Sequence, residues 1–281
     1  MSPSPYSFSF EPLFLVLPAV ASWFYWRAAR RAPAEQRPAG GHIAMFAIGL
    51  LLIAVPLNSP LETISDHYLL LMHLFQNALI ADWGPPLVIL GLTPAMRTAL
   101  AERGGRVFHA VTAPVVALPA WLVIWYGVHV PLFYDWALRA NWPLNIEHLL
   151  LIAAGLLFWW PVFAVPRRLQ PLGTIAYLGI GFLTAPWLSL GYIFSSHPFY
   201  GFYADAPRLW GLSAIRDQNF AGILMNADQT SIFFLAFAWS LLRVLAEEEE
   251  EQRRRDAVFL AAYDQQMLAR STPAERQTHS P

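Results

Sequence analysis

The chain contains no cysteine and no lysine among its 281 residues. The absence of cysteine excludes disulfide bonds, thiolate metal sites, cysteine nucleophiles and haem attached through cysteine. Any metal ion must therefore be held by histidine, methionine, carboxylate or carbonyl groups. The GxSxG, HExxH and phosphate-loop motifs are also absent, and nothing in the sequence supports nucleic-acid binding. We therefore expect a protein that is not an enzyme.

Charged residues are scarce. They make up 13% of the chain, hydrophobic residues make up 56%, and the mean hydropathy is +0.41. Soluble domains carry roughly 25% charged residues. Several apolar runs reach the ~20 residues that a helix needs to cross a bilayer, and tryptophan and tyrosine are plentiful enough for interfacial belts. The sequence predicts an all-α integral membrane protein.

The apolar runs predict about seven transmembrane helices in one domain, residues 1–245. Proline, glycine and asparagine separate the runs, as expected at helix ends. The first ten residues lack the basic start of a signal peptide, so we expect the first run to be retained as a span. The predicted spans are residues 11–28, 42–57, 66–92, 108–130, 144–165, 172–194 and 219–245.

The placement of arginine predicts the orientation. Arginines cluster after the first, third and fifth spans, whereas the opposite loops hold only Arg139, Arg208 and Arg216. Because cytoplasmic loops are enriched in basic residues, we expect the N-terminus outside and the C-terminus in the cytoplasm. The clustered arginines are Arg27, Arg30, Arg31, Arg37, Arg97, Arg103, Arg106, Arg167 and Arg168.

Residues 246–281 form a charged tail. Three Glu–Arg pairs at i, i+4 favour a solvated helix. We expect a cytoplasmic helix resting on the membrane surface, and a docking site for a partner is the alternative. From Ser271 onward we expect disorder. The charge pairs are Glu249–Arg253, Glu250–Arg254 and Glu251–Arg255, and the apolar stripe beyond them is Phe259, Tyr263 and Met267.

The third span carries polar residues within an apolar run. Asp66, His73 and Asn77 occupy relative positions 0, 7 and 11, which one continuous helix would place on one face. Ionisable groups inside a bilayer are costly, so this face should point into the bundle. Pro85 and Pro86 should end or kink the helix.

The predicted topology gathers further polar side chains in the outer leaflet. His129 ends the fourth span, and Glu147 and His148 open the fifth. Imidazoles from separate helices can bind copper, ligate haem iron as a pair, or relay protons beside carboxylates. Several of these residues also suit simpler roles, as interfacial histidines or as a helix cap at Asp217. The other members of the set are His67, His197, Asp217 and Met225.

Four stretches of the chain match a known pattern, in order and at similar spacing. They are His73–Asn77 with Pro85–Pro94, Trp125 with His129–Pro131 and Tyr134–Asp135, Glu147–His148 with Gly155–Pro161, and Asp217–Gln218 with Gly222 and Met225. With these stretches the chain resembles the CtaG-like (caa-type) multi-span cytochrome c oxidase assembly proteins.

The resemblance implies a membrane assembly factor of the bacterial plasma membrane that helps to deliver copper to oxidase subunits at the outer side. It implies metal binding by His73, His129, His148, Asp217 and Met225. Further candidates are Asp66, His67, Asn77, Glu147 and His197. The family pattern has a second histidine where Asn77 stands and another where Leu144 stands. A haem-binding electron carrier and a transporter or receptor are the alternatives from other classes.

Overall fold

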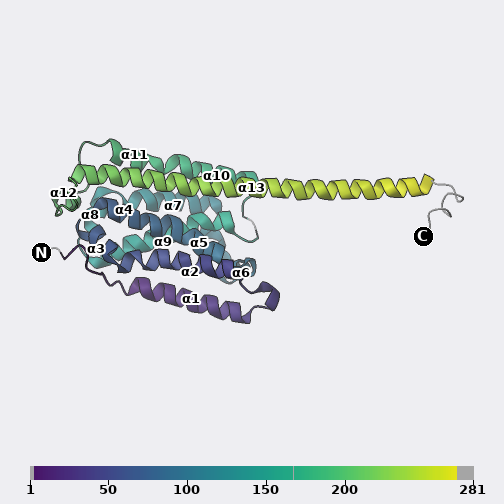
Figure 1. The fold of residues 1–281 in the computed structure, drawn as a ribbon, viewed down its shortest axis with the longest axis horizontal. Helices are drawn as coiled ribbons and strands as arrows, with labels where there is room; N and C mark the ends of the chain where they lie inside the picture. Colours follow the sequence, from purple (N-terminus) through teal and green to yellow (C-terminus); the bar gives the residue numbers. More distant parts are fainter. Residues whose placement is uncertain (1–2, 167, 271–281) are drawn as a thin grey trace. The chain divides into compact units, whose positions relative to one another are not determined.

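The computed structural model describes residues 3–166 and 168–270, which form helices and short connections with no β-strand among them (Figure 1). The predicted all-α fold is therefore confirmed. The chain divides into two units, Met1–Phe234 and Leu235–Pro281. The first unit contains the candidate site, and the second contains the charged tail, residues 246–281.

The helices follow one another with few long connections. The described helices have, in half of the cases, a proline at the first or second helical position, where the missing N–H costs no helical hydrogen bond. They are α1 (Leu13–Arg31), η1 (Ala34–Gln36), α2 (Gly40–Ala54), η2 (Pro56–Asn58), α3 (Pro60–His67), α4 (Leu70–Ala78), the π-helical turn η3 (Leu79–Trp83), α5 (Gly84–Gly91), α6 (Pro94–Val111), α7 (Pro114–Val128), α8 (Pro131–Ala137), α9 (Asn141–Phe163), α10 (Pro171–Thr184), α11 (Pro186–Phe194), α12 (Gly201–Asp205) and α13 (Ala214–Arg270).

The apolar helices support a membrane protein. In the described residues, three segments are long and apolar enough to cross a bilayer: Asn141–Phe163, Pro171–Phe194 and Ala214–Met267. The number rises to five if each of two bent pairs, α4–α5 with α6 and α7 with α8, counts as one span. The count of seven and the orientation of the termini stay predictions.

The predicted third span is wrong as a single helix. Helix α3 ends at His67, and the backbone is extended at Leu69 (φ −132°, ψ 122°) before α4 begins. Asp66 is therefore not on one continuous helical face with His73 and Asn77, although the latter two remain one turn apart. The two prolines do not end the helix: the π-helical turn η3 stops at Trp83, directly before Gly84 and Pro85, and helical structure continues through both prolines to Gly91.

The arginine-rich stretch around Arg97–Arg106, predicted as a loop, forms helix α6. The Thr93 side chain caps its first turn by accepting from the Met96 N–H at 3.3 Å, and Pro94 occupies the first helical position. The helix is interrupted at Gly105, whose φ of 57° a residue with a side chain rarely adopts.

The tail is helical as predicted, but α13 runs through into it without a break up to Arg270. The three charge pairs of the tail form, at 2.5, 3.8 and 2.6 Å. Phe259, Tyr263 and Met267 are exposed. The disorder predicted from Ser271 falls outside the described residues, as does Arg167.

Helix α9 packs against α5, α7, α8 and η3, so it is the central element of the first unit. Gly155 allows the closest of these approaches, because a Cβ there would overlap the Ala81 carbonyl oxygen of η3 and lie 2.8 Å from Pro85 Cγ. Small residues at such contacts let membrane helices pack backbone to backbone.

Replacing Gly155 by alanine should lower the free energy of unfolding by about 1–3 kcal/mol, since the added methyl group overpacks this contact. Gly179→Ala is the matched control, because nothing lies within 4 Å of a Cβ at that position. Denaturant unfolding in detergent micelles, followed by tryptophan fluorescence, measures the free energy of unfolding of both variants. Equal stability of the two variants would refute the packing role of Gly155.

Candidate functional site

Helix α4 is anchored by a side chain from far along the chain. Asp217, near the start of α13, accepts hydrogen bonds from the backbone N–H groups of Leu70 (2.8 Å) and Leu71 (2.9 Å). The first N–H groups of a helix have no partner within it, and a carboxylate there complements the helix dipole. This cap sets the start of α4 and so the direction in which His73 and Asn77 face.

His73 is fully buried within a short chain of hydrogen bonds. Its Nδ1 lies 2.8 Å from the Tyr203 hydroxyl, and that hydroxyl donates to the Ser65 carbonyl at 2.5 Å. A tyrosine has one hydroxyl proton, and a carbonyl can only accept it. His73 must therefore donate from Nδ1, which leaves a lone pair on Nε2 in the neutral ring.

The Nε2 atom of His73 faces a carboxylate. Glu147 Oε1 lies 3.3 Å from it and also accepts from Asn77 Nδ2 at 3.1 Å. Both His73 and Glu147 are completely buried. A lone pair and a carboxylate oxygen repel each other unless a positive charge lies between them. The pair is thus suited to hold one cation, either a proton or a metal ion.

Two further imidazoles lie around this pair. The ring of His148, on α9, is 5.9 Å from the ring of His73, and neither of its nitrogens has a partner in the described part of the chain. His129, which caps the C-terminus of α7, donates from Nδ1 to the Trp125 carbonyl at 2.6 Å, so its Nε2 is an unpaired acceptor. Buried polar atoms are normally paired, so these nitrogens indicate a site for a donor or a cation.

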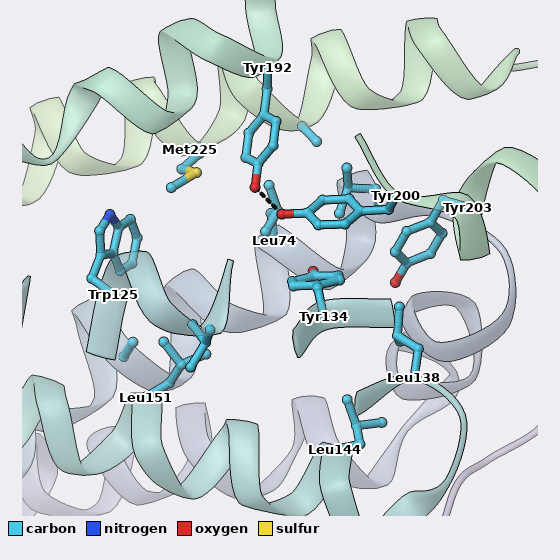
Figure 2. Close-up of a cluster of buried hydrophobic side chains, with 14 residues drawn as sticks. Leu74, Trp125, Tyr134, Leu138, Leu144, Leu151, Tyr192, Tyr200, Tyr203 and Met225 are labelled. Carbon is cyan, nitrogen blue, oxygen red and sulfur yellow. Dashed lines mark hydrogen bonds between the residues drawn. The ribbon is translucent and has the colours of Figure 1, made fainter. Parts of the chain in front are cut away.

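Four tyrosines, Tyr134, Tyr192, Tyr200 and Tyr203, gather in one buried cluster (Figure 2), and two of them, Tyr134 and Tyr203, lie next to His73. The Tyr134 ring lies 5.0 Å from that of His73 and 5.9 Å from that of His129, and it stacks on Tyr200 at 4.2 Å. The Tyr200 hydroxyl donates to the His129 carbonyl at 2.9 Å and also bonds to the Tyr192 hydroxyl. These tyrosines keep the imidazoles out of contact with water. Electrostatic interactions are stronger in such a buried site than in water.

The family model for the cytochrome c oxidase caa3 assembly factor, Caa3_CtaG, matches residues 23–247. The match covers most of the chain and every histidine of the cluster. The chain belongs to this family. The resemblance noted in the sequence is therefore confirmed, and an assembly role implies association with the oxidase. No curated protein and no solved structure matches the chain significantly.

The assembly factor brings four of the predicted site residues into direct proximity: His73, Asn77, Glu147 and His148. His129 joins them across the Tyr134 ring, and Glu147 interacts electrostatically with all three histidines. The i, i+4 pair on α4 and the adjacent Glu–His pair on α9 therefore face each other.

The other predicted site residues of the assembly factor lie apart from this cluster. Both carboxylate oxygens of Asp217 are engaged in capping α4. Met225 is buried in the apolar cluster with Trp125 and Tyr192 (Figure 2). His197 is exposed, with its Nδ1 2.9 Å from Ser196 Oγ.

The two remaining candidates lie on α3. His67 lines a surface pocket of about 540 Å³ together with Arg139 and Asp205. Asp66 is half-buried, and its Oδ1 has no partner among the residues that the structure describes.

Sequence reasoning missed Tyr203, which fixes the tautomer of His73, and Glu62 and Gln76, which lie next to the cluster. The dense tyrosines between α11 and α13 were the available signal for Tyr203. No local pattern predicts that Tyr203 bonds to His73, because the two residues are 130 positions apart in the sequence.

The donor atoms of the assembly factor suit a soft or borderline metal, since imidazole nitrogens bind copper and zinc. Across residues 3–166 and 168–270, however, no three His, Asp or Glu side chains are placed to ligate one ion. The cluster offers the His73–Glu147 pair with His148 beside it. This is fewer than the three or four converging ligands of a resident metal site.

Proposed function

We propose that this assembly factor handles copper for the oxidase as cargo, without catalysing a reaction, and that His73 and His148 hold the ion. The observation that carries the proposal is the set of unpaired imidazole nitrogens in a buried cluster that contains no cysteine. Copper accepts imidazole ligands, and a buried positive ion needs the negative charge that Glu147 supplies.

The small number of ligands supports delivery over permanent storage. A resident metal site normally has three or four converging protein ligands. Here the rings of His73 and His148 lie 5.9 Å apart, and the positions of the two family histidines hold Asn77 and Leu144. An ion held by two nitrogens beside one carboxylate is released to a stronger site more readily than one in a closed shell.

We place the site at the outer side of the plasma membrane. The arginine-rich helix α6 lies at the opposite end of the first unit from α3, α8 and α12 (Figure 1). Those three helices carry Ser65, Tyr134 and Tyr203, which lie next to His73 or bond to its hydrogen-bond partner. Since basic segments stay in the cytoplasm, the histidine end faces outward. Oxidase subunits that receive the ion are the proposed partners.

The purified full-length protein should contain about one copper ion per chain after exposure to Cu(I) under reducing conditions and removal of loosely held metal. Metal analysis by mass spectrometry measures this. A preparation that stays empty under both reducing and oxidising conditions would refute the copper proposal. Deleting the gene should lower the copper content of the oxidase in the membranes.

The same preparation separates copper from the haem alternative. Cu(I) has a filled d shell and gives a colourless protein, whereas a haem ligated by two histidines gives a strong Soret band. A Soret band in place of copper would assign the imidazoles to haem.

A further inference from the structure

Two aspartates that are far apart in the sequence are in contact between η3 and α13. Asp82 lies in the π-helical turn η3, where it is buried, and Asp228 lies on α13, where it is half-buried. Their carboxyl groups hydrogen-bond to each other. The indole Nε1 of Trp83, the residue after Asp82, donates to Asp228 Oδ1 at 2.5 Å. This bond fixes the second carboxyl group against the turn that carries the first.

Both aspartates lie well inside apolar segments. Asp82 is in Leu70–Gly91, the first part of a bent candidate span, and Asp228 is in the candidate span Ala214–Met267. Asp82 is nine positions beyond His73, and Asp228 is eleven positions beyond Asp217. A helix rises about 1.5 Å per residue, so these separations are about 14 and about 17 Å. The pair is therefore separate from the histidine cluster and lies deeper in the membrane, where an ionisable side chain is costly and indicates a function.

No positive charge offsets the two carboxyl groups. In the part of the chain that the structure describes, no arginine or histidine forms an ion pair with either one. Helix α5, packed against η3, has no ionisable residue, and α7, α10 and α11, packed against α13, have only tyrosines. The remaining ionisable residues of the packed elements lie several positions from these contacts: His42 on α2, His73 on α4, Glu147 and His148 on α9, and Arg216, Asp217 and Arg243 on α13.

A hydrogen bond between two carboxyl groups requires a proton. An ionised carboxylate can only accept, so two carboxylates in contact repel each other, and one must be protonated to donate. Asp82 Oδ2 is buried and receives no hydrogen bond from an N–H or hydroxyl group in residues 3–166 or 168–270. The Trp83 indole donates to Asp228 and leaves the contact between the two carboxyl groups without a donor of its own. The ligand that this contact needs is a hydrogen ion.

We propose that Asp82 and Asp228 form a proton-binding site within the membrane, in which one shared proton links η3 to α13. A metal ion does not suit the pair, because a metal site needs three or four ligands and no third His, Asp or Glu side chain converges on it in the described ranges. Asp228 is the member that exchanges the proton, since part of its side chain is exposed. π-helical turns occur frequently at functional sites. Loss of the proton leaves two like charges in contact and loosens η3 from α13.

The test is the protonation state of the two carboxyl groups in the full-length protein. Dicyclohexylcarbodiimide dissolves in lipid and reacts with carboxyl groups in their protonated form. At about pH 8 an exposed aspartate is ionised, so in lipid vesicles Asp228 should be modified and the exposed Asp205 should not. Peptide mass spectrometry reads both residues. Absence of the label from both Asp82 and Asp228 would overturn the proposal.

Asp82→Asn tests whether the proton is shared. The asparagine amide donates to Asp228 in place of the proton, so the labelling of Asp228 at this pH should fall severalfold. Thr230→Ala, at an exposed position two residues further along α13, is the matched control and should be labelled like the wild type. Equal labelling of Asp228 in the two variants would refute the shared proton. So would labelling that sodium or magnesium ions suppress, because the pair would then hold a metal ion.

Infrared spectroscopy gives a second reading that needs no labelling and does not depend on copper. A protonated carboxyl group has a carbonyl stretching band that a carboxylate lacks. At about pH 8, where exposed acids are ionised, the wild-type protein should show this band, shifted in heavy water, with more intensity than the Asp82→Asn, Asp228→Asn double variant. Identical spectra of the two proteins in the carboxyl region would overturn the proposal.

Discussion

His73→Gln should lower the affinity of the protein for Cu(I) by more than ~100-fold. Loss of a partner that only orients a metal ligand lowers metal affinity roughly 10–100-fold, and this substitution removes the proposed ligand itself. Glutamine retains a polar group beside Tyr203 and Glu147, so the fold should survive. His73 is fully buried in contact with both residues, which makes it the most sensitive position in the cluster.

His197→Ala is the control, because it also removes an imidazole, but one that is exposed and lies apart from the cluster. Competition with a Cu(I) chelator gives the affinities, and oxidase activity in membranes of the corresponding strains gives the physiological effect. Full copper retention in His73→Gln would contradict the assignment. So would equal losses in the two variants.

Asp217→Ala should lower the free energy of unfolding by about 3 kcal/mol. It removes two hydrogen bonds to a charged group, and each of these is worth roughly 1.5–3 kcal/mol. The Leu70 N–H, which is buried, would have no replacement partner at the start of α4. Because α4 carries His73 and Asn77, the variant should also retain less copper.

Asp217→Asn keeps one acceptor oxygen and should recover part of the stability. Asp205→Ala, at an exposed carboxylate, controls for the loss of negative charge at the same end of the protein. Titration with a denaturing detergent, followed by the fluorescence of the 12 tryptophans, reports the unfolding. If Asp217→Ala and Asp205→Ala unfold alike, the cap does not hold α4.

Much of the candidate site follows from short-range patterns. Polar residues in an apolar run had to face a protein interior, so periodicity alone predicted that His73 and Asn77 share a face. The positions of Glu147 and His148 at the start of a span placed them at the same depth. Periodicity failed at Asp66, because the chain breaks after His67 and α4 begins anew under the Asp217 cap.

Composition and periodicity by themselves determined that this is a helical membrane protein, and the ordered motifs determined its family. These features are local: each depends on residues a few positions apart. The tertiary structure alone decided that Nε2 of His73 and both nitrogens of His148 lack a hydrogen-bond partner in the described residues. The contacts that set these rings in place join residues far apart: 70 positions in Asn77–Glu147, 130 in His73–Tyr203 and 147 in Leu70–Asp217. Such contacts depend on how the helices pack, and no spacing within a single helix encodes them.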